Sequence, residues 1–469
     1  MKGKAMTKNL TEGKPMKLVL GFAAPLLFGV LFQQFYSFVD TAIVGQFLGA
    51  SKLAAVGATG SVNFLVIGLC LGFCSGFGIP IAQAFGANDT ERLHRCVYHA
   101  VLLSAVFSLV FGALATVLCR PMLQLMDTPA EVIDASVSYI SIIFAAIPCC
   151  VLYNMASAIL RSLGDSRTPV VFLVVASLVN IVLDLFLIIV CRLDVAGAAI
   201  ATAVSQLVSG LGCVIVMVRR YPILRMSREE REFSPALAKE MLLVGLPMGL
   251  QYSITAVGSV VVQSAVNGLG VSAVAAVSAA SKISAFFCCV FDALASTMAT
   301  FAGQNIGARK LGRVNEGLRA ASVIGCAYCV LAFGAVALFA RPLLGMFIDA
   351  GANARVMDMG VEYLMINSAF YIPLLFVNIV RLSIQGMGFT RPAMFAGLFE
   401  MIARTAVALF AVPRMGYTGA CLANPAAWIM ADVFLFPCYR RVTRTLRGRI
   451  MPDMPEYKRP EFHFRRRAA

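Results

Sequence analysis

Long apolar stretches separated by short polar segments run along the whole chain. Blocks such as LVLGFAAPLLFGVLFQQFYSFV, VVFLVVASLVNIVLDLFLIIV and VIGCAYCVLAFGAVALFA each hold roughly 20 residues, enough for an α-helix to cross about 30 Å of hydrocarbon. These blocks are continuous, whereas the strands of an outer-membrane barrel alternate between apolar and polar residues. The pattern therefore predicts an all-α membrane protein whose helices cross the bilayer.

We predict twelve transmembrane helices. They cover residues 16–45, 53–79, 96–119, 132–161, 168–191, 195–219, 239–267, 272–302, 316–340, 356–386, 392–412 and 418–440. Lys and Arg gather in the loops and tails on one side of this arrangement, and cytoplasmic segments of membrane proteins carry such an excess. We therefore expect a multi-pass protein of a bacterial plasma membrane, with both termini in the cytoplasm.

The composition agrees with a membrane protein and excludes several classes of function. Of the 469 residues, 59% are hydrophobic and only 13% are charged, which excludes an ordinary soluble domain. The formal charge of +15 comes from basic loops and tails that suit anionic lipid, so no nucleic acid partner is needed. The chain has no phosphate-binding P-loop, and His94, His99 and His463 stand at or outside the predicted bilayer without a paired nucleophile and base. We therefore expect neither an enzyme nor a cofactor.

The second half of the chain repeats the first. LGASKLAAVGATGS at 48–61 returns as LGVSAVAAVSAASK at 269–282, and RPMLQLM at 120–126 returns as RPLLGMF at 341–347. Each half holds six predicted helices, an even number, so both copies enter the membrane in the same orientation, as two lobes that could rock about a central cavity. We predict a cytoplasmic tail at 1–15, an N-lobe at 16–219, a cytoplasmic linker at 220–238, a C-lobe at 239–440 and a basic cytoplasmic tail at 441–469.

Four polar side chains of the N-lobe converge on one region of the predicted bilayer. At about 1.5 Å per helical residue, Asp40, Asp184 and Thr202 lie roughly 8 to 13 Å below the outer surface, and Asn180 lies about 18 Å below it. Intramembrane charges are costly and usually functional, and no Lys or Arg in this half of the lobe can neutralise them. The two carboxyls could exchange protons or, with the amide and hydroxyl oxygens, bind Na⁺. Alternatively, they only hydrogen-bond between helices.

The C-lobe carries a different polar set, which falls in the cytoplasmic half of its helices. Its members are Asp292, Arg381, Glu400 and Arg404, whose formal charges cancel. Glu400 and Arg404 are four residues apart and share a helix face. A structural polar network is one explanation, and direct contact with a substrate is the other.

Pro25 could be a hinge in the first helix. It removes a backbone hydrogen bond below Asp40 and permits a bend that protonation of Asp40 could change. The alternative is a static kink, in which Gln33 and Gln34 bond to neighbouring groups. A further set of residues could line a cavity for flat cations or could be ordinary packing: Tyr36, Met155, Gln251, Phe286 and Phe287.

Several motifs occur in an order that resembles the multidrug and toxic compound extrusion (MATE) transporters. They are APLLFGVLFQQFYSFVDTAIVG, LGASKLAAVGATGS, IPIAQAFGAND, RSLGDSRTP, NIVLDLFLI and GAAIATAVSQ. The resemblance implies two six-helix bundles forming a V around a central cavity. It also implies multidrug efflux by alternating access, with organic cations or amphipathic toxic compounds exported in exchange for H⁺ or Na⁺.

The resemblance also assigns roles to residues. The family's N-lobe cation site maps onto Asp40, Asn180, Asp184 and Thr202, so any bound metal ion would be Na⁺ at the two aspartates. Some branches use carboxylates of helices 7 and 10 instead, but helix 7 here has Gln251 and Gln263, which favours the N-lobe site. We expect small organic substrates, a surrounding lipid bilayer and a monomer.

A related function is a flippase for a lipid-linked precursor, as found in the same superfamily. Such a protein would be expected to have a strongly basic cavity for a pyrophosphate. Few cations fall at mid-membrane depth in this chain, so antiport is the leading prediction.

Overall fold

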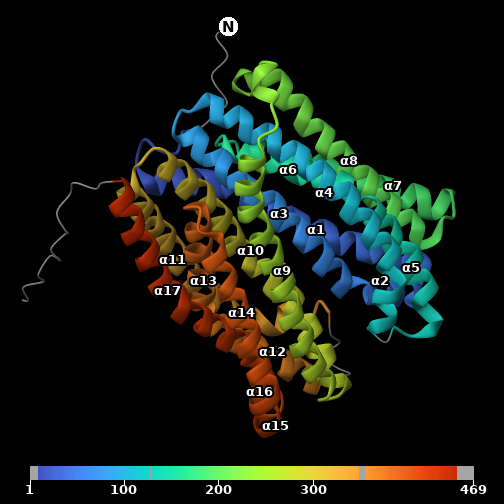
Figure 1. Ribbon diagram of the computed structural model, residues 1–469. Coiled ribbons are helices and arrows are strands. Elements are labelled where there is room, and N and C mark those ends of the chain that lie inside the picture. The colour runs from blue at the N-terminus through green and yellow to red at the C-terminus, as the bar shows by residue number, and fades with distance from the viewer. Residues whose placement is uncertain (1–8, 127, 348–353, 451–469) are drawn as a thin grey trace, which may run out of the picture.

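The computed structural model describes residues 9–126, 128–347 and 354–450, a part of the chain that is almost entirely helical and contains no strand (Figure 1). The first half holds α1 (Pro15–Leu48), α2 (Ala50–Ala58), α3 (Gly60–Gly86), α4 (Thr90–Leu125), α5 (Ala130–Ala145), α6 (Ile147–Ser162), α7 (Arg167–Leu185), a π-helical turn (Phe186–Val190) and α8 (Asp194–Arg220). The second half holds α9 (Pro235–Asn267), α10 (Val271–Gly307), α11 (Leu311–Leu344), α12 (Ala354–Ala369), α13 (Tyr371–Gly386), α14 (Thr390–Ala406), a π-helical turn (Val407–Ala411), α15 (Val412–Met415), α16 (Tyr417–Cys421) and α17 (Ala423–Ile450).

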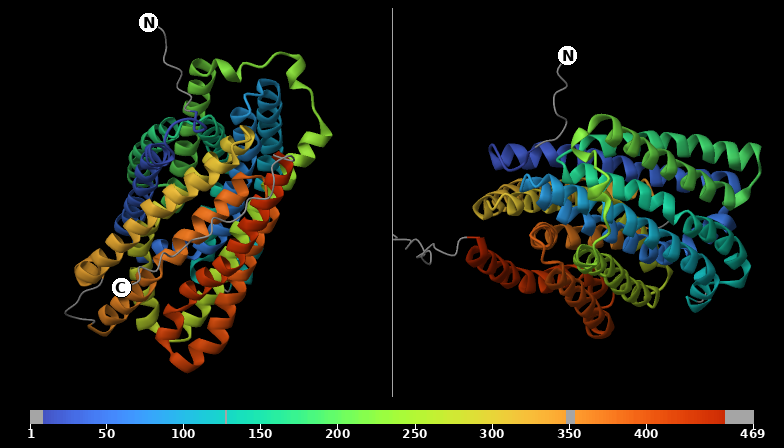
Figure 2. Two further views of the ribbon diagram at one scale, coloured as in Figure 1. Left: turned by 90° about the vertical axis from the view of Figure 1, so that its left-hand side faces the viewer. Right: turned by 45° about the horizontal axis from the view of Figure 1, so that its top comes forward.

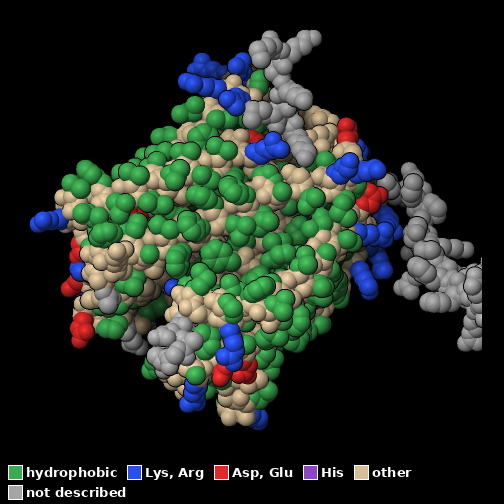
Figure 3. Space-filling view, turned by 180° about the vertical axis from the view of Figure 1, so that it is seen from behind, with side chains coloured by type: hydrophobic (Ala, Val, Ile, Leu, Met, Phe, Trp, Pro, Cys, Tyr) green, Lys and Arg blue, Asp and Glu red, His purple; other side chains and the backbone are tan. Residues whose placement is uncertain are grey.

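The helices have the length and composition of membrane spans. Within the described residues, ten runs are long and apolar enough to cross a bilayer, and there are twelve if the bent pairs α5–α6 and α12–α13 each form one span. Apolar side chains cover the broad face of the molecule, and charged side chains gather toward its ends (Figure 3). The predicted all-α fold with up to twelve spans is confirmed.

The two halves repeat each other in backbone detail. α5 and α6 meet at 45°, and α12 and α13 meet at 50°, with the breaks after Ala145 and Ala369, 224 residues apart. Left-handed backbone conformations also recur, at Gly164 (φ 87°) and Gly388 (φ 92°), where glycine avoids the strain of a side chain. This correspondence confirms the predicted repeat.

The linker between the halves is shorter than the predicted segment 220–238. α8 ends at Arg220 and α9 begins at Pro235, so the C-lobe starts four residues before the predicted position 239. Ser234 caps α9 by accepting a hydrogen bond from the backbone N–H of Leu237 at 3.4 Å, and Pro235 suits the first helical position. At the other end α17 continues to Ile450, past the predicted limit of 440. Most of the basic tail, with His463, lies outside the described residues.

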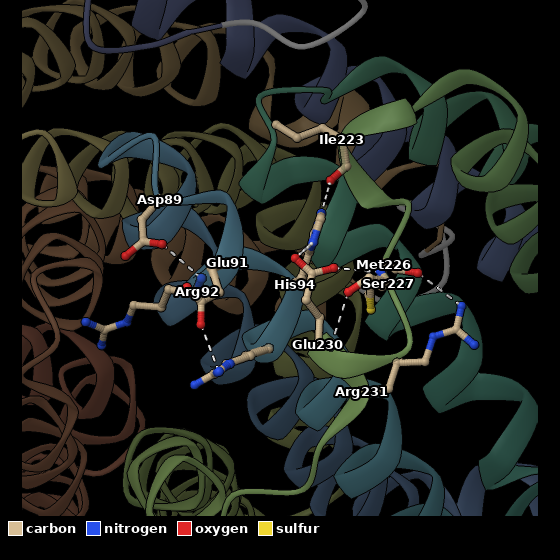
Figure 4. A network of polar contacts seen from close by, with 10 residues as sticks. Asp89, Glu91, Arg92, His94, Ile223, Met226, Ser227, Glu230 and Arg231 are labelled. Carbon is tan, nitrogen blue, oxygen red and sulfur yellow. Dashed lines mark hydrogen bonds and ion pairs between the residues drawn. The ribbon is translucent and has the colours of Figure 1, made fainter.

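The linker contains two short 3₁₀ turns, Pro222–Leu224 and Glu229–Arg231, and crosses between the bundles (Figure 2). A polar network fixes it to α4 (Figure 4). His94 Nε2 lies 2.6 Å from the Ile223 carbonyl oxygen, and His94 Nδ1 lies 2.7 Å from Glu230 Oε1. Hydrogen bonds from the Ser227 backbone and from His94 hold the pKa of the Glu230 carboxyl below its usual value.

The two bundles meet at the end that carries this linker, which we call the joined end. There Gln83 Nε2 donates to the Gly386 carbonyl at 3.1 Å, and Gln304 Nε2 donates to the Ser162 carbonyl at 2.8 Å. The first pair runs from N-lobe to C-lobe and the second from C-lobe to N-lobe, so the contact has approximate two-fold symmetry. Toward the other end the bundles diverge, and α5 lies far from α16 (Figure 1).

Glycine is required where α3 and α10 touch at the joined end. A Cβ atom on Gly86 would lie 2.0 Å from the Gln304 carbonyl oxygen, and one on Gly307 would lie 1.9 Å from the Gln83 carbonyl oxygen. Any larger residue would push the two lobes apart. These glycines let the backbones approach closely enough for the glutamine hydrogen bonds.

The start of the chain is also bound at the joined end. Leu10 is fully buried, and its backbone N–H donates to Gln304 Oε1 at 2.9 Å. Phe22 and Leu26 of α1 then join the apolar core of the C-lobe, whereas Ile43 and Val44 pack with Ile188 and Ala198 of the N-lobe. α1 is therefore a single helix that contacts both lobes.

Candidate functional site

The structure brings together the four polar residues of the N-lobe. Asn180 and Asp184 lie one turn apart near the end of α7 and are fully buried. The Asn180 amide nitrogen donates to Asp184 Oδ2 at 2.8 Å, and its oxygen accepts from the backbone N–H of Thr202 on α8 at 3.1 Å. Asp40 of α1 presents its carboxyl directly to that of Asp184. We call this group the acid pair site.

The acid pair site contains no basic group. Tyr36 contacts Thr202, and Tyr139 of α5 lies beside both carboxyls, but within the described residues no Lys or Arg acts on Asp40 or Asp184. One oxygen of each carboxyl is buried without a hydrogen-bond partner. Unpaired carboxylate oxygens accept a proton or a hard cation such as Na⁺, and the Asn180 and Thr202 oxygens are further ligands of the same kind.

Local packing holds these helices together. A Cβ atom on Gly29 would lie 2.8 Å from Val170 Cγ2, so glycine lets α1 approach α7 closely. The π-helical turn Phe186–Val190 follows Asp184 almost directly. Such turns are rare and frequently lie at functional sites. We find no signal for this turn in the sequence, and Tyr139 was also missed because it lies in an ordinary apolar helix pattern.

The predicted hinge lies inside a continuous helix. Pro25 is part of α1 and lies among the residues that contact the C-lobe, directly before Leu26 and fifteen residues before Asp40. Gln33 is exposed and Gln34 is partly buried, and neither side chain hydrogen-bonds to another described residue. The glutamine contacts expected for a static kink are thus absent among the described residues, and the hinge at Pro25 stays a prediction.

The residues predicted to share a cavity are separated. Tyr36 lies at the acid pair site, whereas Met155 is buried in the N-lobe core and lines a cavity of about 520 Å³ between α4, α6 and α8. Gln251 accepts a hydrogen bond from Gln385 Nε2 at 2.5 Å inside the C-lobe. Phe286 is exposed on α10, and Phe287 packs on the C-lobe cores. For Met155 and Phe287, ordinary packing is the better explanation.

The C-lobe residues form a network around one carboxylate. Glu400 Oε1 accepts from Arg381 Nη1 at 2.6 Å, and Glu400 Oε2 lies 3.6 Å from Arg404 Nη1. Arg404 Nε also donates to Asn424 Oδ1 at 3.3 Å, and Asp292 lies near Arg381.

Sequence reasoning missed one member of this network. Asp432 of α17 faces Arg381 and Glu400, so three acids stand beside two bases and the predicted charge balance is wrong. The signal was present, because Asp432 is a single acid in an apolar run, just as Asp40 is.

Comparison with known proteins decides the family. A profile of the MatE family matches residues 25–186 and 247–410, once in each half and at the spacing of the repeat. The chain belongs to the MATE family.

Relatives of this MATE protein carry transporter names. It is 29% identical to the probable multidrug resistance protein YoeA of Bacillus subtilis (strain 168), over 70% of this chain and 72% of the relative. It is 24% identical to the FAD transporter of Shewanella oneidensis, over 76% of this chain and 79% of the relative. It is therefore a membrane transporter and not an enzyme.

Solved structures share the fold. The crystal structure of MATE in the straight conformation superimposes with a TM-score of 0.86 at 22% identity, covering 96% of this chain and all of the other. An outward-facing multidrug resistance MATE transporter gives a TM-score of 0.86 at 23% identity, with the same coverage. The predicted MATE-like arrangement of two bundles is confirmed.

Proposed function

We propose that this MATE protein is a multidrug efflux antiporter that exports organic cations or other amphipathic compounds in exchange for H⁺ or Na⁺. The observation that carries the proposal is the acid pair site, where two facing carboxyls have free oxygens and no basic partner. Buried charges of this kind are expensive and mark ion pathways. Its relatives include multidrug resistance proteins and an FAD transporter, so the substrate is an amphipathic compound of moderate size.

α1 supplies the coupling in this proposal. Its last third holds Asp40, and its first turns pack on the C-lobe at the joined end. Pro25, which removes one backbone hydrogen bond at the end of the C-lobe contact, is the point where α1 would bend when Asp40 gains or loses an ion. Loading of the acid pair site would then favour release of substrate on one side of the membrane, and unloading would favour binding on the other.

The proposed topology follows from the charge pattern. Arg- and Lys-rich segments, including the linker, lie at the joined end, so this end faces the cytoplasm. The bundles diverge toward the outside, and the conformation described here is outward-facing. We propose that the protein acts as a monomer with cytoplasmic termini in the bacterial plasma membrane, and that the N-lobe and C-lobe move as units.

Transport by purified protein in liposomes tests this function. A proton gradient and a sodium gradient are imposed separately, and uptake of a fluorescent organic cation is followed. We expect one gradient to drive uptake and the other to have little effect. A membrane potential of about 100 mV supplies about 2.3 kcal/mol per charge, enough for roughly tens-fold accumulation. Uptake that is equal with and without both gradients would contradict antiport.

A further inference from the structure

A small cavity lies on the seam between the lobes, close to the joined end. Its walls come from α3 and α6 of the N-lobe and from α9, α10 and α13 of the C-lobe, and its volume is about 60 Å³. Ser162, whose carbonyl accepts from Gln304, forms part of the wall. The cavity therefore lies where the lobes would separate in a transport cycle.

One cation points into this cavity. Arg161 lies in the last turn of α6, and Arg161 Nη1 donates to Ser157 Oγ at 2.7 Å. That hydroxyl is the one hydrogen-bond partner of Arg161 among the described residues. The groups that act most strongly on its charge are Tyr153, Cys74 and Tyr252, none of which is a carboxylate.

The remaining polar groups of the cavity are hydroxyls. Ser75 of α3, Tyr252 of α9 and Ser296 of α10 line it, and their side chains have no hydrogen-bond partner within the described part of the chain. No Asp or Glu belongs to the lining. The cavity thus offers one guanidinium and three hydroxyls as donors, without a carboxylate to receive them.

The buried arginines of the C-lobe network differ from Arg161, because each of them lies beside a carboxylate. Arg381 and Arg404 both face the Glu400 carboxylate, and Arg381 also lies near Asp292 and Asp432. Arg161 has no such partner. A cation held in the membrane without an acid is costly, and a guanidinium with free donors binds carboxylate or phosphate oxygens in a fork.

We propose that Arg161, together with the hydroxyls of Tyr252, Ser75 and Ser296, is a subsite for an anionic group of the transported compound, either a carboxylate or a phosphate. A volume of about 60 Å³ is far below the roughly 300–1,000 Å³ of a complete drug-sized site, so the pocket holds one small group and not a whole molecule. The substrate class is therefore an amphipathic compound with an acidic group, such as a zwitterion. This inference rests on the proposed efflux function.

Two dyes that differ in one group test the subsite. Tetramethylrhodamine is a zwitterion with a free carboxylate, and its methyl ester is a permanent cation of nearly the same size and shape. Each is titrated with purified wild-type protein in detergent, and binding is followed by fluorescence anisotropy. The same titrations are run with Arg161→Gln, with Arg161→Lys and with Arg167→Gln, a control that removes an exposed arginine from the same lobe.

We expect the wild type to bind the carboxylate dye more tightly than the ester. Arg161→Gln should weaken binding of the carboxylate dye by about ten-fold to a hundred-fold, as expected for a lost charge-assisted hydrogen bond. Binding of the ester should stay within about two-fold or become tighter, because a repelling charge is gone. Arg161→Lys should keep part of the preference, and Arg167→Gln all of it.

Equal affinities of the wild type for the two dyes would overturn the proposal, as would an equal loss for both dyes in Arg161→Gln. The wild-type comparison stands even if a variant does not fold. The result of the dye comparison does not depend on the result of the gradient experiment in liposomes. A carboxylate preference without gradient-driven uptake would refute antiport and leave the subsite, and gradient-driven uptake without the preference would refute the subsite alone.

Discussion

Asn180 and Thr202 of the N-lobe have counterparts in the C-lobe with a different chemistry. Arg404 and Asn424 lie 224 and 222 residues later, close to the repeat offset. Each pair bonds across two helices, since Asn180 accepts from the Thr202 backbone N–H and Arg404 Nε donates to Asn424 Oδ1. In the N-lobe these positions flank two unpaired carboxyls. In the C-lobe the guanidinium of Arg404 lies there instead, beside the Glu400 carboxylate.

Under the proposed function, one fold would hold a mobile ion in one copy and a fixed cation in the other. Tyr139 and Tyr363 are also 224 residues apart and occupy equivalent positions in the two repeats. Tyr139 lies beside the two aspartates, and the Tyr363 hydroxyl accepts a hydrogen bond from Asn424 Nδ2 at 3.2 Å. The C-lobe cation is covalently attached, so it cannot exchange with solvent. Among the described residues, the N-lobe copy is the one where two carboxyls with free oxygens face each other without a basic partner, so we propose that H⁺ or Na⁺ enters and leaves there.

The strongest test of this comparison removes the N-lobe charges. Asp40→Asn and Asp184→Asn should each reduce ion-driven transport by about ten-fold to a hundred-fold, because a coupling ion would lose a charged ligand worth about 1.5–3 kcal/mol. Uptake into liposomes under the driving gradient measures this. Asp134→Asn, which removes an exposed partner of Arg120, is the control and should transport normally. Undiminished uptake in both site variants would place the coupling ion elsewhere.

Removal of the C-lobe acid should act on stability first. Glu400→Gln leaves Arg381 and Arg404 without their shared carboxylate, and loss of one member of a buried ion pair typically costs about 3–5 kcal/mol. A clear drop in the melting temperature of the purified protein is expected. The matched control is Glu240→Gln, which breaks an exposed pair with Arg92 and should change stability by less than about 1 kcal/mol. An unchanged melting temperature for Glu400→Gln would refute the fixed-ion interpretation.

Where the two repeats are alike, matching substitutions should have matching effects. Gly86→Ala and Gly307→Ala each place a methyl group into the backbone of the other lobe, and such overpacking costs about 1–3 kcal/mol. Both should shift the protein away from the joined conformation to a similar extent, as seen by distances between spin labels on the two lobes. Gly334→Ala, where the added atom meets nothing within 4 Å, should leave the distances unchanged. A large effect from one substitution alone would argue against the two-fold character of the contact.

The smallest expected effect concerns the linker and pH. Since the pKa of Glu230 in the folded protein lies below the ordinary 4.5, its contacts stabilise the linker above that pH and are lost as the pH falls through the lowered value. Protease cleavage within residues 221–234 should therefore rise only under acid conditions below about pH 4.5. Glu230→Gln should cleave readily at neutral pH as well. Cleavage that begins near neutral pH in the wild type would point to a different group.

The sequence alone predicted the two helical halves because the length of the apolar blocks and the spacing of the repeat extend over the whole chain. Twenty-residue apolar blocks require helices, and a constant offset requires a repeat. Depth counting also placed Asp40, Asn180, Asp184 and Thr202 together, since helix rise is nearly constant. It could not show that Met155 lines a cavity away from Tyr36 and the acid pair site, because the rotation of each helix depends on its neighbours. Sequence reasoning assigned Arg161 no role beyond the end of the predicted helix 132–161, because the cavity around it forms only where helices of the opposite lobe pack against α3 and α6.

The burial of Leu10 against Gln304 affects where a label or a fusion partner can be attached to the protein. Gln304 accepts from Leu10 with its side-chain oxygen and donates to the Ser162 carbonyl of the N-lobe with its side-chain nitrogen, so parting of the bundles would change the surroundings of residue 10. A fluorophore attached near residue 10 would therefore report on the working cycle directly, and a bulky fusion placed there would interfere with it.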